Sequence, residues 1–161
     1  MNKGRTIERE SFRIIDEEMK RRFPPDQHSI VRRVIHATGD FEFEDIIRFH
    51  HDAVSAGLEA IRCGRKVLVD VKMVSAGINP KRLKKHSSGV LCFISDEDVI
   101  ERSESGYGTR AEIAIEKAAA LYGNEIGIVA IGNAPTALLK VMELKDKELF
   151  DPSLIVGVPV G

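Results

Sequence analysis

The sequence predicts an α/β fold, in which a parallel β-sheet carries helices on both faces. Short apolar runs alternate with helical patterns along the chain, which is typical of strands joined by helical crossovers. The runs at 67–69 and 128–131 are continuously apolar, as expected for strands buried on both faces. With 161 residues, the chain is expected to form a single domain over residues 1–161.

The first part of the chain is predicted to be helical. From Thr6 to Phe23 the apolar residues recur at helical spacing, and Pro24 and Pro25 then end the helix. A second short helix is predicted over residues 29–37, before Gly39, a residue suited to a left-handed cap. His36 therefore falls in the last turn of that helix.

Five strands are expected, at residues 46–49, 67–71, 90–94, 127–131 and 154–158. Helical patterns ending at Gly64 and Gly123, and a third that begins near Asn133, supply the crossovers. Right-handed crossovers and short loops make a flavodoxin-like three-layer sandwich with a five-stranded parallel sheet the most economical topology. The last apolar run has no helix after it, so we expect a missing segment or a partner subunit to cover it.

Composition excludes several classes of protein. Lys and Arg total 24 against 25 Asp and Glu, a net charge of -1, so no overall field favours nucleic acid or an anionic membrane. No apolar run reaches the roughly 18 residues of a membrane span, and the protein is expected in the cytoplasm. Cys63 and Cys92 lack the spacing of a zinc or CxxC site, so both are expected to be buried thiols.

Polar and glycine-rich loops follow the predicted strands, where ligands bind in doubly wound folds. No two histidines have the i, i+4 spacing of a helical metal site, so we predict no metal. Asp96, Glu97 and Asp98 could bind magnesium as in receiver-like domains, but a solvated loop or helix cap is favoured. Phosphate-binding loops and nucleophile elbows are absent. Acid–base chemistry by histidine and anchoring by arginine remain, although His36 could simply interact with the helix dipole.

Six segments carry a family resemblance, at residues 11–15, 31–40, 69–78, 108–111, 130–138 and 157–161. The most specific are IHATG at 35–39 and GNAPTA at 132–137. In the same order, these segments resemble the precorrin-8X methylmutase family, the precorrin isomerases of cobalamin biosynthesis. The resemblance implies a flavodoxin-like fold and a homodimer with its active site near the subunit interface. It also implies a methyl shift on ring C of a tetrapyrrole, precorrin-8X or cobalt-precorrin-8, that gives the corrin product without a cofactor.

The resemblance implies that His36 is the general acid, which protonates the macrocycle and so promotes a 1,5-sigmatropic methyl shift. Arg110 would pair with a substrate carboxylate. The predicted substrate-binding residues are Ser11, Thr38, Asp70, Met73, Thr109, Arg110 and Asn133. Structural alternatives remain open: Asp70 could cap a turn, Met73 could belong to the core, and Asn133 could be a helix cap. Arg32, Arg33 and Lys72 are expected to be mainly solvated.

The sequence departs from the family pattern at its end. Family members usually continue past the GVPVG segment at 157–161 with a phenylalanine, small residues and a further helix, which this sequence lacks. The alternative function is therefore a tetrapyrrole- or corrinoid-binding relative of the enzyme that does not turn its ligand over.

Overall fold

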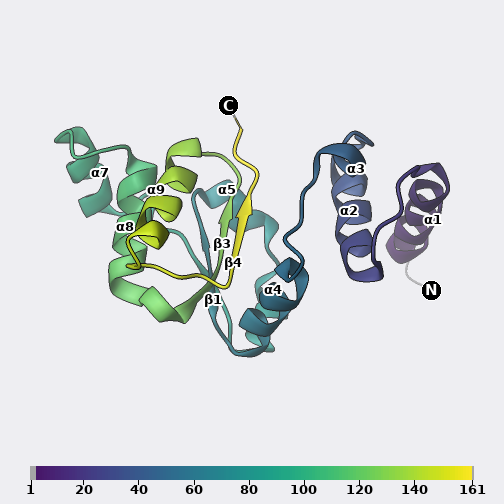
Figure 1. Cartoon of the computed structure of the whole chain (residues 1–161), viewed down its shortest axis with the longest axis horizontal. Helices are drawn as coiled ribbons and strands as arrows, with labels where there is room; N and C mark the ends of the chain where they lie inside the picture. The colour runs from purple at the N-terminus through teal and green to yellow at the C-terminus, as the bar shows by residue number, and fades with distance from the viewer. Residues whose placement is uncertain (1–2, 161) are drawn as a thin grey trace. The chain divides into compact units, whose positions relative to one another are not determined.

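A computed structural model describes residues 3–160 of the chain (Figure 1). The chain divides into two compact units, Met1–Val54 and Ser55–Gly161. Among residues 3–160, the first unit contains helices without a strand, and the second contains the sheet. The expectation of a single domain stays a prediction, and each unit is described by itself.

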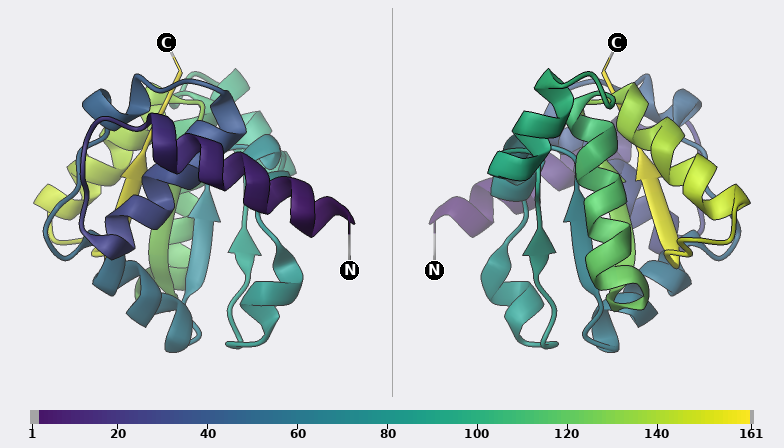
Figure 2. Two further views of the ribbon diagram at one scale, coloured as in Figure 1. Left: turned by 90° about the vertical axis from the view of Figure 1, so that its right-hand side faces the viewer. Right: turned by 90° about the vertical axis from the view of Figure 1, so that its left-hand side faces the viewer.

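The first unit contains three helices, α1 (Lys3–Glu18), α2 (Pro25–Thr38) and α3 (Phe43–Ile46). Figure 2 shows α1 and α2 as the two long helices of this unit. Their apolar faces meet around the buried Ile15, Val31 and Ile35. The two helices predicted from sequence are confirmed, although α1 ends at Glu18, before the predicted boundary at Phe23.

The buried carboxylate of Glu44 stabilises the turn after α1. It accepts hydrogen bonds from the backbone N–H groups of Lys20 (2.9 Å) and Arg21 (3.0 Å), and the residue is 4% exposed. These two donors lie beyond the last turn of α1 and would otherwise lack a partner within the helix. A side chain more than twenty residues along the chain therefore fixes where the chain leaves α1.

The strand predicted at 46–49 is wrong. Ile46 is the last residue of α3, and the chain continues in extended form without pairing to the sheet. Ile47 and Phe49 instead pack on the helical core of the first unit. A short apolar run does not distinguish a strand from a segment that covers a helix pair, and here packing on α1 and α2 decides the outcome. The sheet has four strands, not five.

The second unit carries this sheet, made of β1 (Lys66–Val69), β2 (Val90–Leu91), β3 (Ile126–Ile131) and β4 (Leu154–Gly157). All neighbours are parallel, in the order β2-β1-β3-β4. Leu68 pairs with Leu91 on one side and with Val129 on the other. The connecting helices are α4 (Ala53–Arg62), α5 (Lys72–Gly77), α6 (Pro80–Lys84), α7 (Glu97–Glu104), α8 (Arg110–Tyr122) and α9 (Pro135–Asp146), with a short 3₁₀ helix, η1 (Gly123–Glu125).

Alternate residues of the central strands enter different cores, which makes the sheet the middle of three layers. Leu68 and Val129 pack with residues of α8 and α9, the two helices over one face in Figure 2. Val67, Val69 and Ile128 pack on the other face with α4 and α6. Burying each large aliphatic side chain stabilises the fold by about 1.5–3 kcal/mol. The continuous apolar runs predicted to be buried on both faces are confirmed.

The strand order also locates the point where the connections diverge. From β1 the chain crosses to β2 at one edge, and from β3 it crosses to β4 at the other. The crevice at the carboxyl ends of β1 and β3 is therefore the topological switch point, where open α/β sheets bind ligands.

The two cysteines differ in their exposure. Cys63 is exposed and Cys92 is half-buried, so the expectation of two buried thiols is wrong. The Cys63 thiol lies 3.2 Å from the Glu59 carboxylate, which raises the thiol pKa.

No helix among residues 3–160 is long and apolar enough to cross a membrane.

Candidate functional site

Asp70 ties the two strands at the switch point together. It follows β1, is 1% exposed, and accepts the backbone N–H groups of Gly132 (3.1 Å), Asn133 (2.8 Å) and Ala134 (2.8 Å) after β3. A Cβ on Gly132 would lie 2.6 Å from the Val74 side chain, so only glycine fits there. Asp70 thus shapes the loop, and its contact with substrate stays a prediction.

The starts of α8 and α9 lie side by side at the same edge of the sheet. Thr109 caps α8: its Oγ1 accepts the Glu112 N–H (3.2 Å), and its own N–H donates to the Glu112 carboxylate (2.8 Å). The hydrogen bond that the Thr109 N–H donates to the carboxylate is the largest cause that lowers the pKa of Glu112. The Thr109 hydroxyl also lies 3.1 Å from that of Thr136, near the start of α9. The N-terminus of each of these two helices adds partial positive charge at this edge.

Three more predicted residues lie in this second unit. Arg110 is the first residue of α8 and is exposed, and its side chain forms no hydrogen bond or ion pair with residues 3–160. Asn133 is half-buried and contacts Asp70 through its backbone. Met73, in α5, is 71% exposed, which contradicts the alternative of a core methionine. Arg110 is free to pair with an anion, and Met73 offers an apolar surface.

The predicted residues of the first unit lie on α1 and α2. His36 is exposed in the last turn of α2, which Gly39 ends in the left-handed conformation (φ 70°). The Thr38 hydroxyl donates to the Val34 carbonyl (2.9 Å) and accepts the Asp40 N–H (3.2 Å). The Ser11 hydroxyl donates to the Ile7 carbonyl (3.1 Å). The exposed imidazole of His36 is thus open to a ligand at the end of α2.

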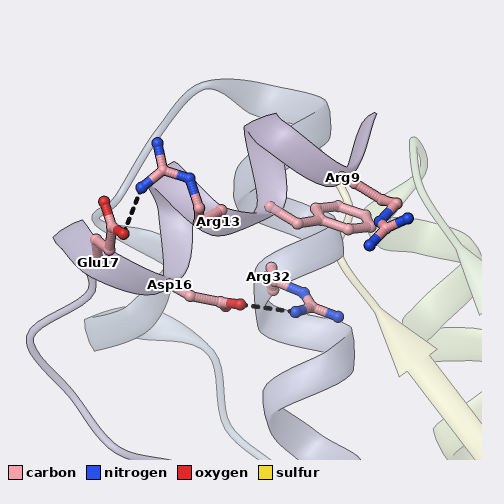
Figure 3. Close-up of a pocket in the computed structure, with 6 residues that line it drawn as sticks. Arg9, Arg13, Asp16, Glu17 and Arg32 are labelled. Carbon is pink, nitrogen blue, oxygen red and sulfur yellow. Dashed lines mark hydrogen bonds and ion pairs between the residues drawn. The ribbon is translucent and has the colours of Figure 1, made fainter. Parts of the chain in front are cut away.

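A shallow hollow of about 440 Å³ lies between α1 and α2 (Figure 3). Its walls are Arg9, Phe12, Arg13, Asp16, Glu17 and Arg32. Figure 3 shows the Arg32 guanidinium directed at Asp16, at 2.8 Å. Burial raises the pKa of Asp16, but hydrogen bonds from Arg32 and His28 outweigh burial and hold that pKa below its ordinary value. Arg32 was expected to be mainly solvated, but it is half-buried and paired with Asp16, a contact between two helices that the local sequence did not reveal.

A family model described as precorrin-8X methylmutase matches residues 6–161. The chain belongs to the precorrin-8X methylmutase family. The cobalt-precorrin-8 methylmutase of Leptospira interrogans is 46% identical over 161 residues, which cover 99% of this chain and 73% of the relative. That of Priestia megaterium is 44% identical, with coverage of 96% and 68%. A crystal structure of precorrin-8X methyl mutase from Thermus thermophilus has a TM-score of 0.86 and 42% identity, covering 98% of this chain and 75% of that one.

In this precorrin-8X methylmutase family member, a lysine pairs with two carboxylates of the acidic loop. Lys117 lies 2.6 Å from Asp96 and 2.5 Å from Asp98, and its hydrogen bond lowers the pKa of Asp98. Asp96 occupies the N-cap position of α7, with Glu97 in the first turn, where the helix dipole favours acidic residues. The Asp96 side chain forms no capping hydrogen bond and pairs with Lys117 instead, so the favoured helix-cap interpretation is not borne out by its hydrogen bonds. That the loop binds no magnesium stays a prediction.

One group of possible metal ligands escaped the sequence analysis of this methylmutase family member. Ligand atoms of His50, His51 and Asp52 all lie within 4.8 Å of one another, and the three residues are exposed. The sequence search considered ligands at helical spacing, whereas these three residues are consecutive in a turn before α4. His51 already pairs with Asp52 at 2.8 Å. The expectation that the protein binds no metal stays a prediction.

Proposed function

We propose that this member of the precorrin-8X methylmutase family moves a methyl group on ring C of precorrin-8X or cobalt-precorrin-8, with His36 as the general acid. The family match over residues 6–161 is the observation that supports the isomerase role in cobalamin biosynthesis. It favours an enzyme over a binding protein without turnover, because the relatives are named as methylmutases at high coverage of this chain. The roles of individual residues are our proposal.

The proton cycle needs one group that gives and takes back a proton. The His36 imidazolium donates a proton to the conjugated macrocycle, which becomes electron-poor. The methyl group then migrates by a 1,5-sigmatropic shift to the neighbouring ring carbon, and the cationic product returns the proton to His36. No atom is gained or lost, so the balance is that of an isomerase. Support comes from the place of His36 at the exposed end of α2, where a ligand can reach its imidazole, and from the ability of histidine to give and take a proton near neutral pH.

Substrate binding requires donors for several carboxylates around a flat apolar ring. Arg110 is the proposed anchor, because its planar fork matches a carboxylate and it is exposed without a described partner. Thr109 and Asn133 add donors near the switch point, and Met73 offers an apolar contact. Ser11 and Thr38 are proposed contacts on the first unit. Any cobalt belongs to the substrate.

The test is an anaerobic absorbance assay with precorrin-8X and cobalt-precorrin-8. His36→Ala is expected to lower kcat by about 10²–10⁴-fold, the usual contribution of a general acid, while the substrate still binds. His86→Ala, which removes another exposed histidine, is the control and should retain activity. Full turnover by His36→Ala would refute the proposed acid. A spectral shift without conversion by the wild type would favour the binding-protein alternative.

A homodimer is also proposed. Leu139 and Met142 lie one turn apart on α9 and are 63% and 51% exposed, and Val156 on the edge strand β4 is 40% exposed. Exposed apolar groups of this kind mark interaction surfaces. Light scattering should give twice the chain mass, and Leu139→Glu with Met142→Glu should give a monomer.

The finer fold class and the location of the protein are further proposals. The order β2-β1-β3-β4 agrees with the first four positions of the flavodoxin order 2-1-3-4-5, which supports a flavodoxin-like class. A cytoplasmic location is the proposal that best suits a biosynthetic enzyme with two free cysteines.

A further inference from the structure

The imidazole of His36 rests against an aromatic ring from another helix. Phe12, on α1, contacts His36, on α2, with ring centroids 5.0 Å apart and planes at 68°. This edge-to-face arrangement is a favoured geometry for aromatic pairs. His36 is exposed, so this contact restricts a side chain that would otherwise rotate freely at the helix end.

Phe12 is itself held from several directions. The guanidinium carbons of Arg32 and Arg33 lie 4.5 Å and 4.7 Å from the centre of its ring. Asp16 fixes Arg32 at 2.8 Å, and Glu8 fixes Arg33 at 2.7 Å. Both carboxylates come from α1, and both arginines lie one turn before His36 on α2. The ion pairs and the ring together form one braced cluster.

We propose that Phe12 is a positioning residue for His36, which it holds in the orientation needed for proton transfer. The inference rests on the proposed role of His36 as general acid. Proton transfer demands a donor within hydrogen-bond reach of the accepting atom, and a shift of about 1 Å can cost 10²-fold in rate. The Phe12 ring supplies this constraint without touching the reacting atoms, while Arg32 and Arg33 keep the ring in place.

The experiment compares Phe12→Leu with Phe43→Leu, a matched control in the same apolar cluster. Phe12→Leu retains an apolar side chain but removes the ring that meets the imidazole. It should lower kcat about 10–100-fold and leave KM within about threefold, whereas Phe43→Leu should retain kcat. Phe12→Tyr keeps the ring and should restore most of the activity. An unchanged kcat in Phe12→Leu would overturn the proposal.

A second measurement does not depend on activity or on the folding of a variant. In NMR spectra of the wild-type chain, ring protons of Phe12 should show cross-relaxation with the imidazole protons of His36, and its absence would overturn the proposal. In Phe12→Leu the imidazole signals should move as the ring current is lost, but not in Phe43→Leu.

The His36→Ala variant separates the two hypotheses. If His36→Ala is inactive and Phe12→Leu is fully active, the positioning role fails and the acid role stands. If His36→Ala is fully active, the proposed acid itself fails, whatever Phe12→Leu shows.

Discussion

The carboxylate of Asp70 is surrounded by backbone amides rather than by a cation. Three N–H groups after β3 donate to it, and their dipoles compensate the buried negative charge. A hydrogen bond to a charged group contributes about 1.5–3 kcal/mol, and a buried group left unpaired costs as much again. The residue therefore determines the geometry of the loop that follows β3.

Asp70→Asn should destabilise the fold by about 2–4 kcal/mol. The new amide retains the shape of the side chain but turns a donor towards at least one of the three N–H groups. The free energy of unfolding from urea titration measures the loss. Asp146→Asn, at an exposed aspartate, is the control and should stay within about 0.5 kcal/mol of wild type. Equal stability of both variants would contradict the assigned role.

At the residue scale, the local sequence predicted what depends on near neighbours. The place of His36 at a helix end followed from Gly39 three positions later, and α2 confirms it. The partners of Asp70 lie 62 to 64 residues away, so no local pattern revealed them. Likewise, Phe12 and His36 meet only because α1 packs on α2. Site geometry made by tertiary contacts lay beyond sequence reasoning.

At the element scale, helix ends decide where the proposed acid lies. Gly39 ends α2 with φ 70°, and its N–H donates to the Ile35 carbonyl. A Cβ at Gly39 would meet nothing within 4 Å, so the cost of a side chain there is conformational, not steric with neighbours. An L-residue pays this cost in the left-handed region.

Gly39→Ala should therefore destabilise the chain by about 1 kcal/mol. Gly77→Ala is the matched control: it too has open space around its Cβ, but its φ lies outside the left-handed region. That variant should be neutral or slightly more stable, since alanine favours the helix. Thermal unfolding of both variants measures the difference, and a loss confined to Gly77→Ala would refute the argument.

Charged contacts link α8 to α9. Lys140 on α9 lies 3.0 Å from Glu116 on α8 and 2.6 Å from Glu143. Hydrogen bonds from Lys140 first and Lys147 second lower the pKa of Glu143 to about 2. A carboxylate with a lowered folded-state pKa stabilises the fold above its ordinary pKa and ceases to do so as the pH falls through the lowered value.

Glu143→Gln should remove this acid-dependent contribution. Above about pH 4.5, the usual pKa of the group, the variant should unfold at lower urea concentration than the wild type. The difference should shrink as the pH falls towards 2, because Glu143 becomes protonated in the wild type. Glu101→Gln, at an exposed glutamate in the middle of α7 with no ion pair among the described residues, controls for charge alone. A difference that is constant from pH 6 to pH 2 would count against the ion-pair explanation.

Among the elements, those with long apolar or capped patterns were predictable and the shortest were not. The central strands β1 and β3 were predicted because continuous apolar runs need burial on both faces. The predicted strand at 46–49 failed because Ile47 and Phe49 found an apolar surface on helices, and β2 covers two residues where five were expected. In short segments, the surface available for packing outweighs β propensity.

At the scale of the whole molecule, the two compact units have separate cores. The first unit's cluster uses residues between Phe12 and Phe49, and the clusters around the sheet use residues from Ala60 onward. In each unit, apolar side chains are thus buried against other side chains of the same unit. The sequence predicted the fold class and the family, but not this division, because which apolar side chains pack together is decided by tertiary contacts.

A fragment covering residues 53–161 should fold and remain inactive. Its sheet retains helices on both faces, whereas His36 and Phe12 are missing. Circular dichroism and cooperative urea unfolding test folding, and the absorbance assay tests turnover beside the full chain. A fragment without cooperative unfolding would show that the second unit depends on the first, and a fragment with full turnover would exclude His36 as the acid.

The hydrogen bonds of Asp70 also carry a consequence for synthesis on the ribosome. Its first partner, Gly132, is made 62 residues later; at translation rates of 5–20 residues per second this delay is roughly 3–12 s. During that interval only water can solvate the carboxylate. Burying the end of β1 before the three N–H groups exist would therefore leave the carboxylate without hydrogen bonds. The crevice at the switch point is therefore completed late, after the chain has been translated through β3, and nascent chains arrested before residue 132 should lack it.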